Sequence, residues 1–263
     1  MKFVLWCVLC GAVLFPVPSD AAEKIQVFIL AGKSNMEGFG LIGEDASEKG
    51  SLAWMAAQPS LKNEFPVLLD ESGDWVLHDS SGDWATRDDV WIYYDRLYDN
   101  RNINNHTVLS GGLTVRYGFR DNMIGPEYGF GHVMGEDCDR PVLLIKTCWG
   151  GRSLYHDFLP PNVEDYPAPK KNGDKGFMYH RILSDAKKVL GNIKGIFPQY
   201  ADQGFEIAGF CWHQGWNDGR SVEVAQQYEQ HMTAFIQDIR RDLQQEFGSR
   251  GDLPFVIASS GFN

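Results

Sequence analysis

The residues best suited to chemistry lie in three short segments, and each segment follows an apolar run of the chain. The segments are residues 31–38, 146–153 and 211–219. Each combines glycines, which leave backbone N–H groups accessible, with polar side chains such as Ser34 and Gln214. A site that stabilises a developing negative charge needs such a set of hydrogen-bond donors. We therefore expect the three segments to meet in one catalytic site.

Two common serine-containing motifs have to be tested against Ser34, which follows Gly32 and Lys33. A phosphate-binding P-loop needs a further glycine five residues before Gly32, but that position holds Val27, inside an apolar run. The nucleophile elbow of α/β-hydrolases needs a glycine two residues after the serine, where this chain has Met36. Neither motif accounts for Ser34, and phosphate or nucleotide binding is disfavoured.

The segments must be positioned by the elements around them. Four short, nearly continuous apolar runs predict buried strands over residues 25–31, 142–147, 205–212 and 255–259. Such runs are typical of a parallel sheet covered on both faces, and such sheets bind ligands at the carboxyl ends of their strands. Helical spacing of apolar residues predicts helices over residues 126–136, 179–193 and 222–247. The alternation predicts an α/β fold with three layers, α/β/α, and a parallel central sheet.

A long region, about residues 40–125, fits no simple crossover between the first two strands. It is rich in Gly, Asp, Asn, Trp and Tyr. A stretch of this length usually has its own small structure or builds a binding surface. We therefore expect a single domain over residues 23–263, with a long insertion after the first strand.

Composition excludes several classes of partner. The net charge is −11 with no basic run, which argues against nucleic acid. Outside the N-terminal 22 residues the cysteines are Cys138, Cys148 and Cys211, and no pair of them has the spacing of metal ligands, so we expect neither a metal nor another cofactor. Residues 1–22 have the pattern of a signal peptide, with Lys2, an apolar stretch and small residues for cleavage after Ala21 or Ala22. No later run is long enough to span a membrane, so a secreted or periplasmic protein is expected.

The first segment, Gly32-Lys33-Ser34-Asn35-Met36-Glu37-Gly38, resembles the GQSNMxG block of SGNH hydrolases. Within that superfamily the closest resemblance is to carbohydrate esterases that include sialate O-acetylesterases and acetylxylan esterases. The resemblance continues, in order, at residues 124–127, at Trp149-Gly150-Gly151-Arg152-Ser153 and at Trp212-His213-Gln214-Gly215. It covers about residues 25–260 and implies a flavodoxin-like version of the three-layer fold.

The resemblance implies a serine esterase that removes O-acetyl groups from carbohydrates through an acyl-enzyme on Ser34. The oxyanion hole would consist of the backbone N–H of Ser34, a backbone N–H from Gly150 or Gly151, and the side-chain amide of Gln214. The implied partner is an acetylated carbohydrate substrate. A catalytically inactive carbohydrate-binding protein that keeps the fold is the alternative.

This sequence departs from the family pattern near the nucleophile. Lys33 replaces the glutamine before the serine, and its ammonium lies either near the site, easing charge there, or in solvent. Trp216 replaces a glutamate found in many relatives. Asp218 keeps an acidic position of the family and is expected to organise its loop. His213 is expected to orient that loop rather than act as the base.

The resemblance also implies a histidine base with a carboxylate partner, often spaced Asp-x-x-His near the C-terminus. None of the 7 histidines has an aspartate three residues before it. We therefore expect the chain to be shorter than its relatives, with the catalytic dyad outside these 263 residues.

Overall fold

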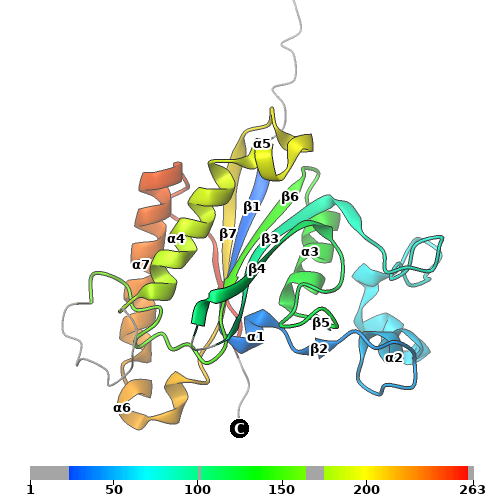
Figure 1. Ribbon diagram of the computed structural model, residues 1–263, viewed down its shortest axis with the longest axis horizontal. Helices are drawn as coiled ribbons and strands as arrows, with labels where there is room; N and C mark the ends of the chain where they lie inside the picture. The colour runs from blue at the N-terminus through cyan, green and yellow to red at the C-terminus, as the bar shows by residue number, and fades with distance from the viewer. Residues whose placement is uncertain (1–23, 100–101, 164–174, 260–263) are drawn as a thin grey trace, which may run out of the picture.

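Three of the apolar runs lie side by side in the middle of a six-stranded sheet (Figure 1). The computed structural model describes residues 24–99, 102–163 and 175–259, so the expected signal peptide lies outside the described residues. In the order β4-β3-β6-β1-β7-β8 the sheet contains β4 (Asn102–Leu113), β3 (Arg87–Asp99), β6 (Val142–Cys148), β1 (Ile25–Gly32), β7 (Phe205–His213) and β8 (Phe255–Ile257). Only β4 is antiparallel to its neighbour. The predicted α/β fold with a largely parallel central sheet is confirmed.

Helices cover both faces of this sheet. The two helices α4 (Phe177–Leu190) and α7 (Tyr228–Phe247) lie on one face, and α3 (Pro126–Asp137) lies on the other (Figure 1). The chain was expected to form one helix over residues 222–247, but it forms α6 (Val222–Ala225) and α7 with a break between them. The short helices are α1 (Ser34–Glu37), α2 (Leu52–Ala56) and α5 (Ile193–Ile196), with 3-10 turns at Pro59–Glu64, Pro66–Leu68, Pro198–Tyr200 and Asp218–Arg220.

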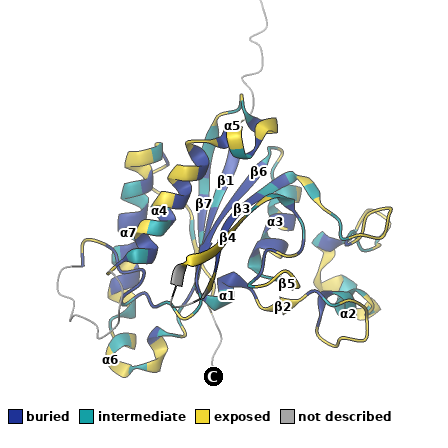
Figure 2. Cartoon of the chain, viewed as in Figure 1, coloured by how far each residue is buried: buried dark blue, intermediate teal, exposed yellow. Residues whose placement is uncertain are grey.

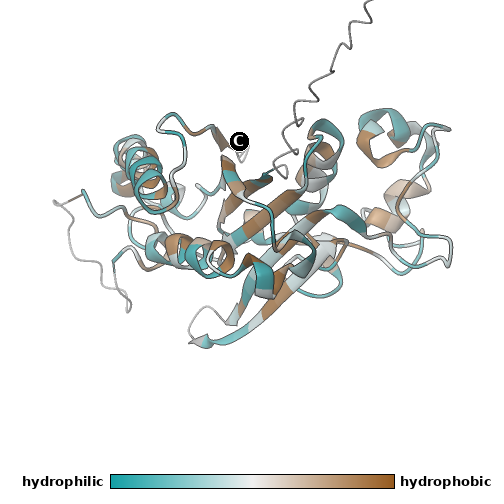
Figure 3. Ribbon diagram, turned by 90° about the horizontal axis from the view of Figure 1, so that it is seen from above, coloured by the Kyte–Doolittle hydropathy of each residue, from teal (hydrophilic) through white to brown (hydrophobic). Residues whose placement is uncertain are grey.

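The side chains of β1 show how the core is divided. Successive side chains of a strand point to opposite faces. Val27 and Ile29 therefore pack with α4 and α7, whereas Leu30 packs on the side of α3. The central strands are buried on both faces (Figure 2), and hydrophobic residues concentrate in them (Figure 3). This double burial explains why their sequences are apolar without alternation.

The insertion after β1 is more than a separate small structure, because it supplies two strands of the main sheet. β3 pairs with β6 in parallel and with β4 in an antiparallel hairpin. The rest of the insertion contains α2, the first two 3-10 turns, and a small sheet of β2 (Gly40–Leu41) and β5 (Met123–Ile124). It also contains two hairpins with the same sequence pattern, Asp-x-Ser-Gly-Asp-Trp, at residues 70–75 and 79–84. In each, the first aspartate accepts hydrogen bonds from two backbone N–H groups of its own turn.

A fully buried ammonium connects the insertion, the sheet and α1. Lys146 of β6 donates to the backbone oxygens of Glu37 at 2.8 Å and Tyr117 at 2.7 Å, and to Glu127 Oε2 at 2.6 Å. Lys146 and Glu127 are both 0% exposed. Buried charges are tolerated when each is paired and hydrogen-bonded in this way. Since Glu37 ends α1, this ammonium ties the helix that begins at Ser34 to the sheet.

Replacing Lys146 by methionine should therefore lower the free energy of unfolding by about 3–5 kcal/mol, because the Glu127 carboxylate is left buried without its partner. Urea denaturation at neutral pH measures this change. The matched control is Lys187→Met, since the Lys187 side chain is 70% exposed and its ion pair with Glu246 lies at the surface. The control should change stability by less than about 1 kcal/mol. Equal effects of the two variants would contradict the assignment.

Candidate active site

The register of the sheet brings the three predicted segments to one edge. Gly32, the last residue of β1, pairs with Cys148 of β6 and with His213 of β7. The residues that follow these strands therefore leave the sheet next to one another. The contact at Gly32 requires glycine, because a Cβ there would lie 2.3 Å from the backbone oxygen of His213. As expected, Ser34 lies just past the end of the first strand, at the start of α1.

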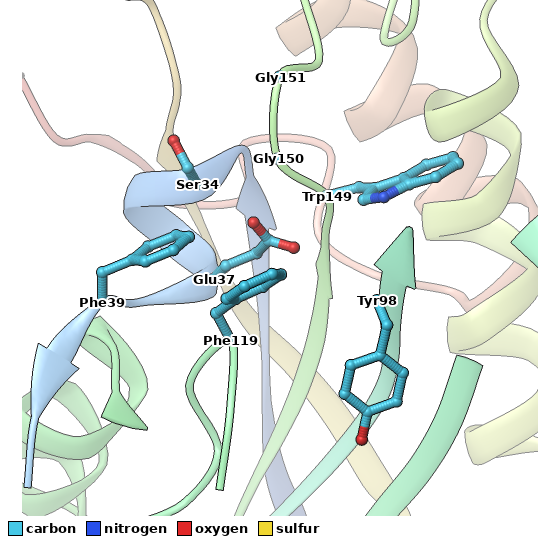
Figure 4. A pocket seen from close by; sticks show the side chains of 8 residues that line it. All are labelled: Ser34, Glu37, Phe39, Tyr98, Phe119, Trp149, Gly150 and Gly151. Atoms are coloured by element: carbon cyan, nitrogen blue, oxygen red, sulfur yellow. The ribbon is translucent and has the colours of Figure 1, made fainter. Parts of the chain in front are cut away.

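Ser34 opens onto a cavity of about 440 Å³ that it shares with the glycines after β6 (Figure 4). The cavity is lined by Ser34, Glu37, Phe39, Tyr98, Phe119, Trp149, Gly150 and Gly151. Gly150 and Gly151 are thus brought to the nucleophile candidate, as the sequence predicted. Their role as oxyanion donors stays a prediction. The Trp149 N–H donates to the backbone oxygen of Gly32 at 3.3 Å, which fixes the start of this loop against β1.

Aromatic side chains form much of the cavity wall. The rings of Phe39 and Phe119 are stacked with centroids 4.8 Å apart, and both rings belong to the insertion side of the cavity (Figure 4). On the opposite wall the guanidinium of Arg152 lies over the Trp149 ring, 3.6 Å from its centroid. Aromatic faces of this kind provide apolar contact area for a ring-shaped ligand.

Gln214 is buried and lines a different cavity from Ser34, with its amide already hydrogen-bonded. Its Nε2 donates to the backbone oxygen of Arg152 at 3.0 Å and to Asp218 Oδ2 at 2.5 Å, and its Oε1 accepts from the Tyr228 hydroxyl at 3.1 Å. The amide therefore joins the loop after β6 to the loop after β7. Donation from Gln214 to an oxyanion requires one of these two N–H bonds to open, so the predicted oxyanion role stays a prediction.

Asp218 connects the same two loops. Its carboxylate accepts from the backbone N–H groups of Leu154 at 3.1 Å and Tyr155 at 2.8 Å, in addition to the Gln214 amide. Burial raises the pKa of Asp218, and these hydrogen bonds oppose that rise. The arrangement is consistent with the organising role expected for this residue.

His213 contacts the segment of the nucleophile without contacting the nucleophile oxygen. Its Nε2 lies 3.4 Å from Asn35 Nδ2, and its backbone oxygen accepts from the Lys33 N–H at 3.3 Å. Burial and the nearby Lys33 ammonium both lower the pKa of His213, which favours the neutral ring. In the ranges that the structure describes, no histidine side chain is hydrogen-bonded to Ser34 Oγ, whose partner there is Lys33 Nζ at 3.0 Å.

Glu37 is a member of the site that the sequence reasoning did not select. Its side chain is 1% exposed, yet its carboxylate lies beside the cavity between Ser34 and Trp149 (Figure 4). No hydrogen-bond donor with good geometry reaches either carboxylate oxygen from the described residues. Burial raises the pKa of Glu37 to about 7, against the opposing effects of the Gly150 N–H and the cations of Lys146, Arg152 and Lys33. The spacing from Ser34, three residues along a helix, is the signal that predicts a shared face.

The residues that the structure describes show neither a metal-binding cluster nor a membrane-spanning helix. They contain no group of three His, Cys, Asp or Glu side chains arranged to hold a metal ion. None of their helices combines the length and apolar character needed to cross a bilayer.

The largely parallel sheet thus carries a candidate nucleophile, Ser34, just past the end of its first strand. The family described as "Carbohydrate esterase, sialic acid-specific acetylesterase" matches residues 24–260. The chain therefore belongs to this family of carbohydrate acetylesterases, as its motifs indicated. No curated protein matches the chain significantly.

The chain is similar to several solved structures at low sequence identity. The protein NanS has 15% identity and a TM-score of 0.51, with 92% of this chain and 69% of that chain covered. A protein from Arabidopsis thaliana has 16% identity and a TM-score of 0.48, with 89% and 73% covered. A carbohydrate acetylesterase from Xanthomonas citri has 17% identity and a TM-score of 0.45, with 88% of this chain and only 41% of that chain covered.

The raised pKa of Glu37 predicts a pH dependence of stability. The folded protein keeps the proton up to a pH of about 7, whereas the unfolded chain loses it near 4.5. The folded state thus binds more protons between these values, and the free energy of unfolding falls as pH rises through them. Glu37→Gln should remove this fall, which amounts to roughly 3 kcal/mol.

Urea denaturation of both proteins at pH values below and above this window measures the difference. The control is Glu246→Gln, because Glu246 is exposed on α7 and should leave the pH dependence unchanged. If the wild type and Glu37→Gln lose stability in parallel as the pH rises, the carboxyl does not titrate as assigned.

Proposed function

We propose that the protein is a serine esterase that removes O-acetyl groups from a carbohydrate, with Ser34 as the nucleophile. The observation that carries this proposal is the register at Gly32, which places Ser34 beside the segments after β6 and β7. Family membership supports an acetylated carbohydrate as the substrate class. The aromatic walls around Ser34 support it as well, since sugar rings pack on such faces.

In the proposed reaction the Ser34 oxygen attacks the acetyl carbonyl carbon while a base takes the hydroxyl proton. The carbonyl oxygen becomes negative, and the backbone N–H groups of Ser34 and of Gly150 or Gly151 stabilise it. The sugar hydroxyl then leaves with a proton, and the acetyl group stays on Ser34. Water attacks this acyl-enzyme, releases acetate and restores the serine.

We assign Gln214 a double role in this scheme. At rest it holds the two loops of the oxyanion region together through Arg152 and Asp218. It becomes a third oxyanion donor when its hydrogen bond to Arg152 opens. His213 and Asp218 support the same loop and do not touch the reacting atoms.

The central test is the formation of an acetyl-enzyme. Incubation with p-nitrophenyl acetate, followed by mass spectrometry of the peptides, should show an acetyl group on Ser34. Hydrolysis of this ester and of O-acetylated sialic acid should be abolished in Ser34→Ala, because the nucleophile is removed. Added chelator should leave the activity unchanged.

The matched control is Ser184→Ala, since Ser184 lies exposed on α4, away from the site. An acetyl group on Ser184, or full activity of Ser34→Ala, would exclude the proposed nucleophile. Binding of acetylated sugar without any acetyl-enzyme would favour the alternative, a carbohydrate-binding protein without catalysis.

We also propose that the protein is secreted or periplasmic, on the strength of the signal-peptide pattern in residues 1–22. N-terminal sequencing of the protein from its native source should then begin at Ala22 or Glu23. A mature chain that begins at Met1 would contradict this.

A further inference from the structure

The side chain of Lys33 folds back onto the nucleophile that follows it. Its Nζ donates to Ser34 Oγ at 3.0 Å and lies 3.4 Å from Asn35 Oδ1. Lys33 is 4% exposed, so the contact is removed from bulk water. The sequence left two placements open for the Lys33 ammonium, near the site or in solvent, and the structure has it near the site.

Burial lowers the pKa of Lys33, and two neighbouring groups offset part of this effect. Its Nζ lies 5.4 Å from the centroid of the Trp216 ring, and a ring face attracts a cation. The carboxyl of Glu37 on α1 acts in the same direction and raises the pKa of Lys33, against a larger lowering by burial. His213, the last residue of β7, also lies near Lys33, and burial and the Lys33 charge lower the pKa of its ring, which favours the neutral imidazole. Arg220 lies over the same Trp216 ring, 5.1 Å from its centroid.

The direction of the hydrogen bond decides what Lys33 can do. An ammonium has three donors and no lone pair, so the Ser34 oxygen accepts this bond. The hydroxyl proton of Ser34 therefore stays available to a base from another part of the site. An ammonium in this position cannot itself be that base.

We propose that the Lys33 ammonium is a catalytic residue that stabilises the negative charge on the Ser34 oxygen. This inference deepens the proposed function and rests on it. In acylation the O–H bond of Ser34 breaks and the proton goes to the base, so the oxygen carries negative charge until its new bond to the acetyl carbon passes that charge to the carbonyl oxygen. In deacylation that bond breaks again, and the ammonium stabilises the departing serine oxygen until it regains a proton.

A neutral glutamine, found at this position in the family pattern, lacks the charge for this task. Charged donors form stronger hydrogen bonds than neutral ones, and the difference grows where water is excluded. The lysine at position 33 thus adds an electrostatic contribution that a glutamine cannot make.

The proposal predicts a characteristic pH profile. Burial lowers the pKa of Lys33 below the ordinary 10.5. The contribution of the ammonium is present below that pKa and is lost as the pH rises through it. The activity of the wild type should therefore fall at alkaline pH, and a variant with no charge at position 33 should lack this fall.

The test compares the wild type with Lys33→Gln and Lys33→Met. Two readouts are measured across the pH range: kcat/KM for p-nitrophenyl acetate, and the rate at which a fluorophosphonate probe labels Ser34. Both variants should lose about 10- to 100-fold in each readout near neutral pH, mainly in kcat. Lys187→Met, on the exposed surface of α4, is the control and should match the wild type.

The outcomes separate this inference from the proposed function. If the wild type is neither acetylated nor labelled at Ser34, the proposed function fails and the inference with it. If Ser34 reacts, but Lys33→Gln and Lys33→Met react as fast with the same pH profile, only the role of Lys33 is overturned. If activity instead rises as Lys33 loses its proton, Lys33 is a neutral base, and the ammonium role is wrong. Lys33→Gln carries the glutamine of the family pattern, and its thermal unfolding shows whether the substitution leaves the fold intact.

Discussion

The packing of the sheet edge that carries the candidate active site depends on the ammonium of Lys146, which has no access to water. Lys146 satisfies its charge with one carboxylate and two backbone oxygens, and these come from α3, α1 and the loop before β5. The Tyr94 ring lies 4.6 Å away and closes the remaining side. A charge buried this completely costs several kcal/mol unless every partner is in place. The position of α1, and with it the serine, is therefore coupled to the packing of the insertion.

At the same edge of the sheet, burial raises the pKa of Glu37 and lowers the pKa of Lys33. Burial favours the neutral forms of Glu37 and Lys33, while their mutual attraction favours the charged forms. Ser34 is half-buried beside both. A nucleophile in such surroundings responds to charge more strongly than one in water, because screening is weak. The chemistry of the site is thus set by side chains within one turn of the serine as much as by the distant loops.

The sequence predicted the four apolar strands and the meeting of three segments at the ends of β1, β6 and β7, because buried parallel strands have a nearly continuous apolar pattern. The expected burial was wrong for β8, where Val256 and Ile257 are 59% and 48% exposed, because this strand lies at the edge of the sheet with a neighbour on one side only. The sequence did not predict β3 as a strand of the main sheet. That strand contains Asp95 and Arg96, which are buried but paired with Arg181 and Asp121 from distant parts of the chain. Buried charges of this kind resemble surface residues in a sequence, since their partners are not apparent. The side-chain directions of Lys33 and Glu37 were not apparent either, because the sequence does not show whether a side chain near Ser34 points into the site or into solvent.

The parallel pairing at Gly32 also has a kinetic consequence. Gln26 pairs with Val142, and Ile25 pairs with Phe205, so the neighbours of β1 are distant in sequence. Contacts of such long range form slowly, because the intervening chain must lose much of its freedom first. The Lys33–Ser34 contact is local and needs only one turn of chain. During folding, the nucleophile and its cation can therefore meet early, whereas the cavity beside Ser34 is completed only when β3 and β6 have joined the sheet, because Tyr98 and Trp149 form part of its wall.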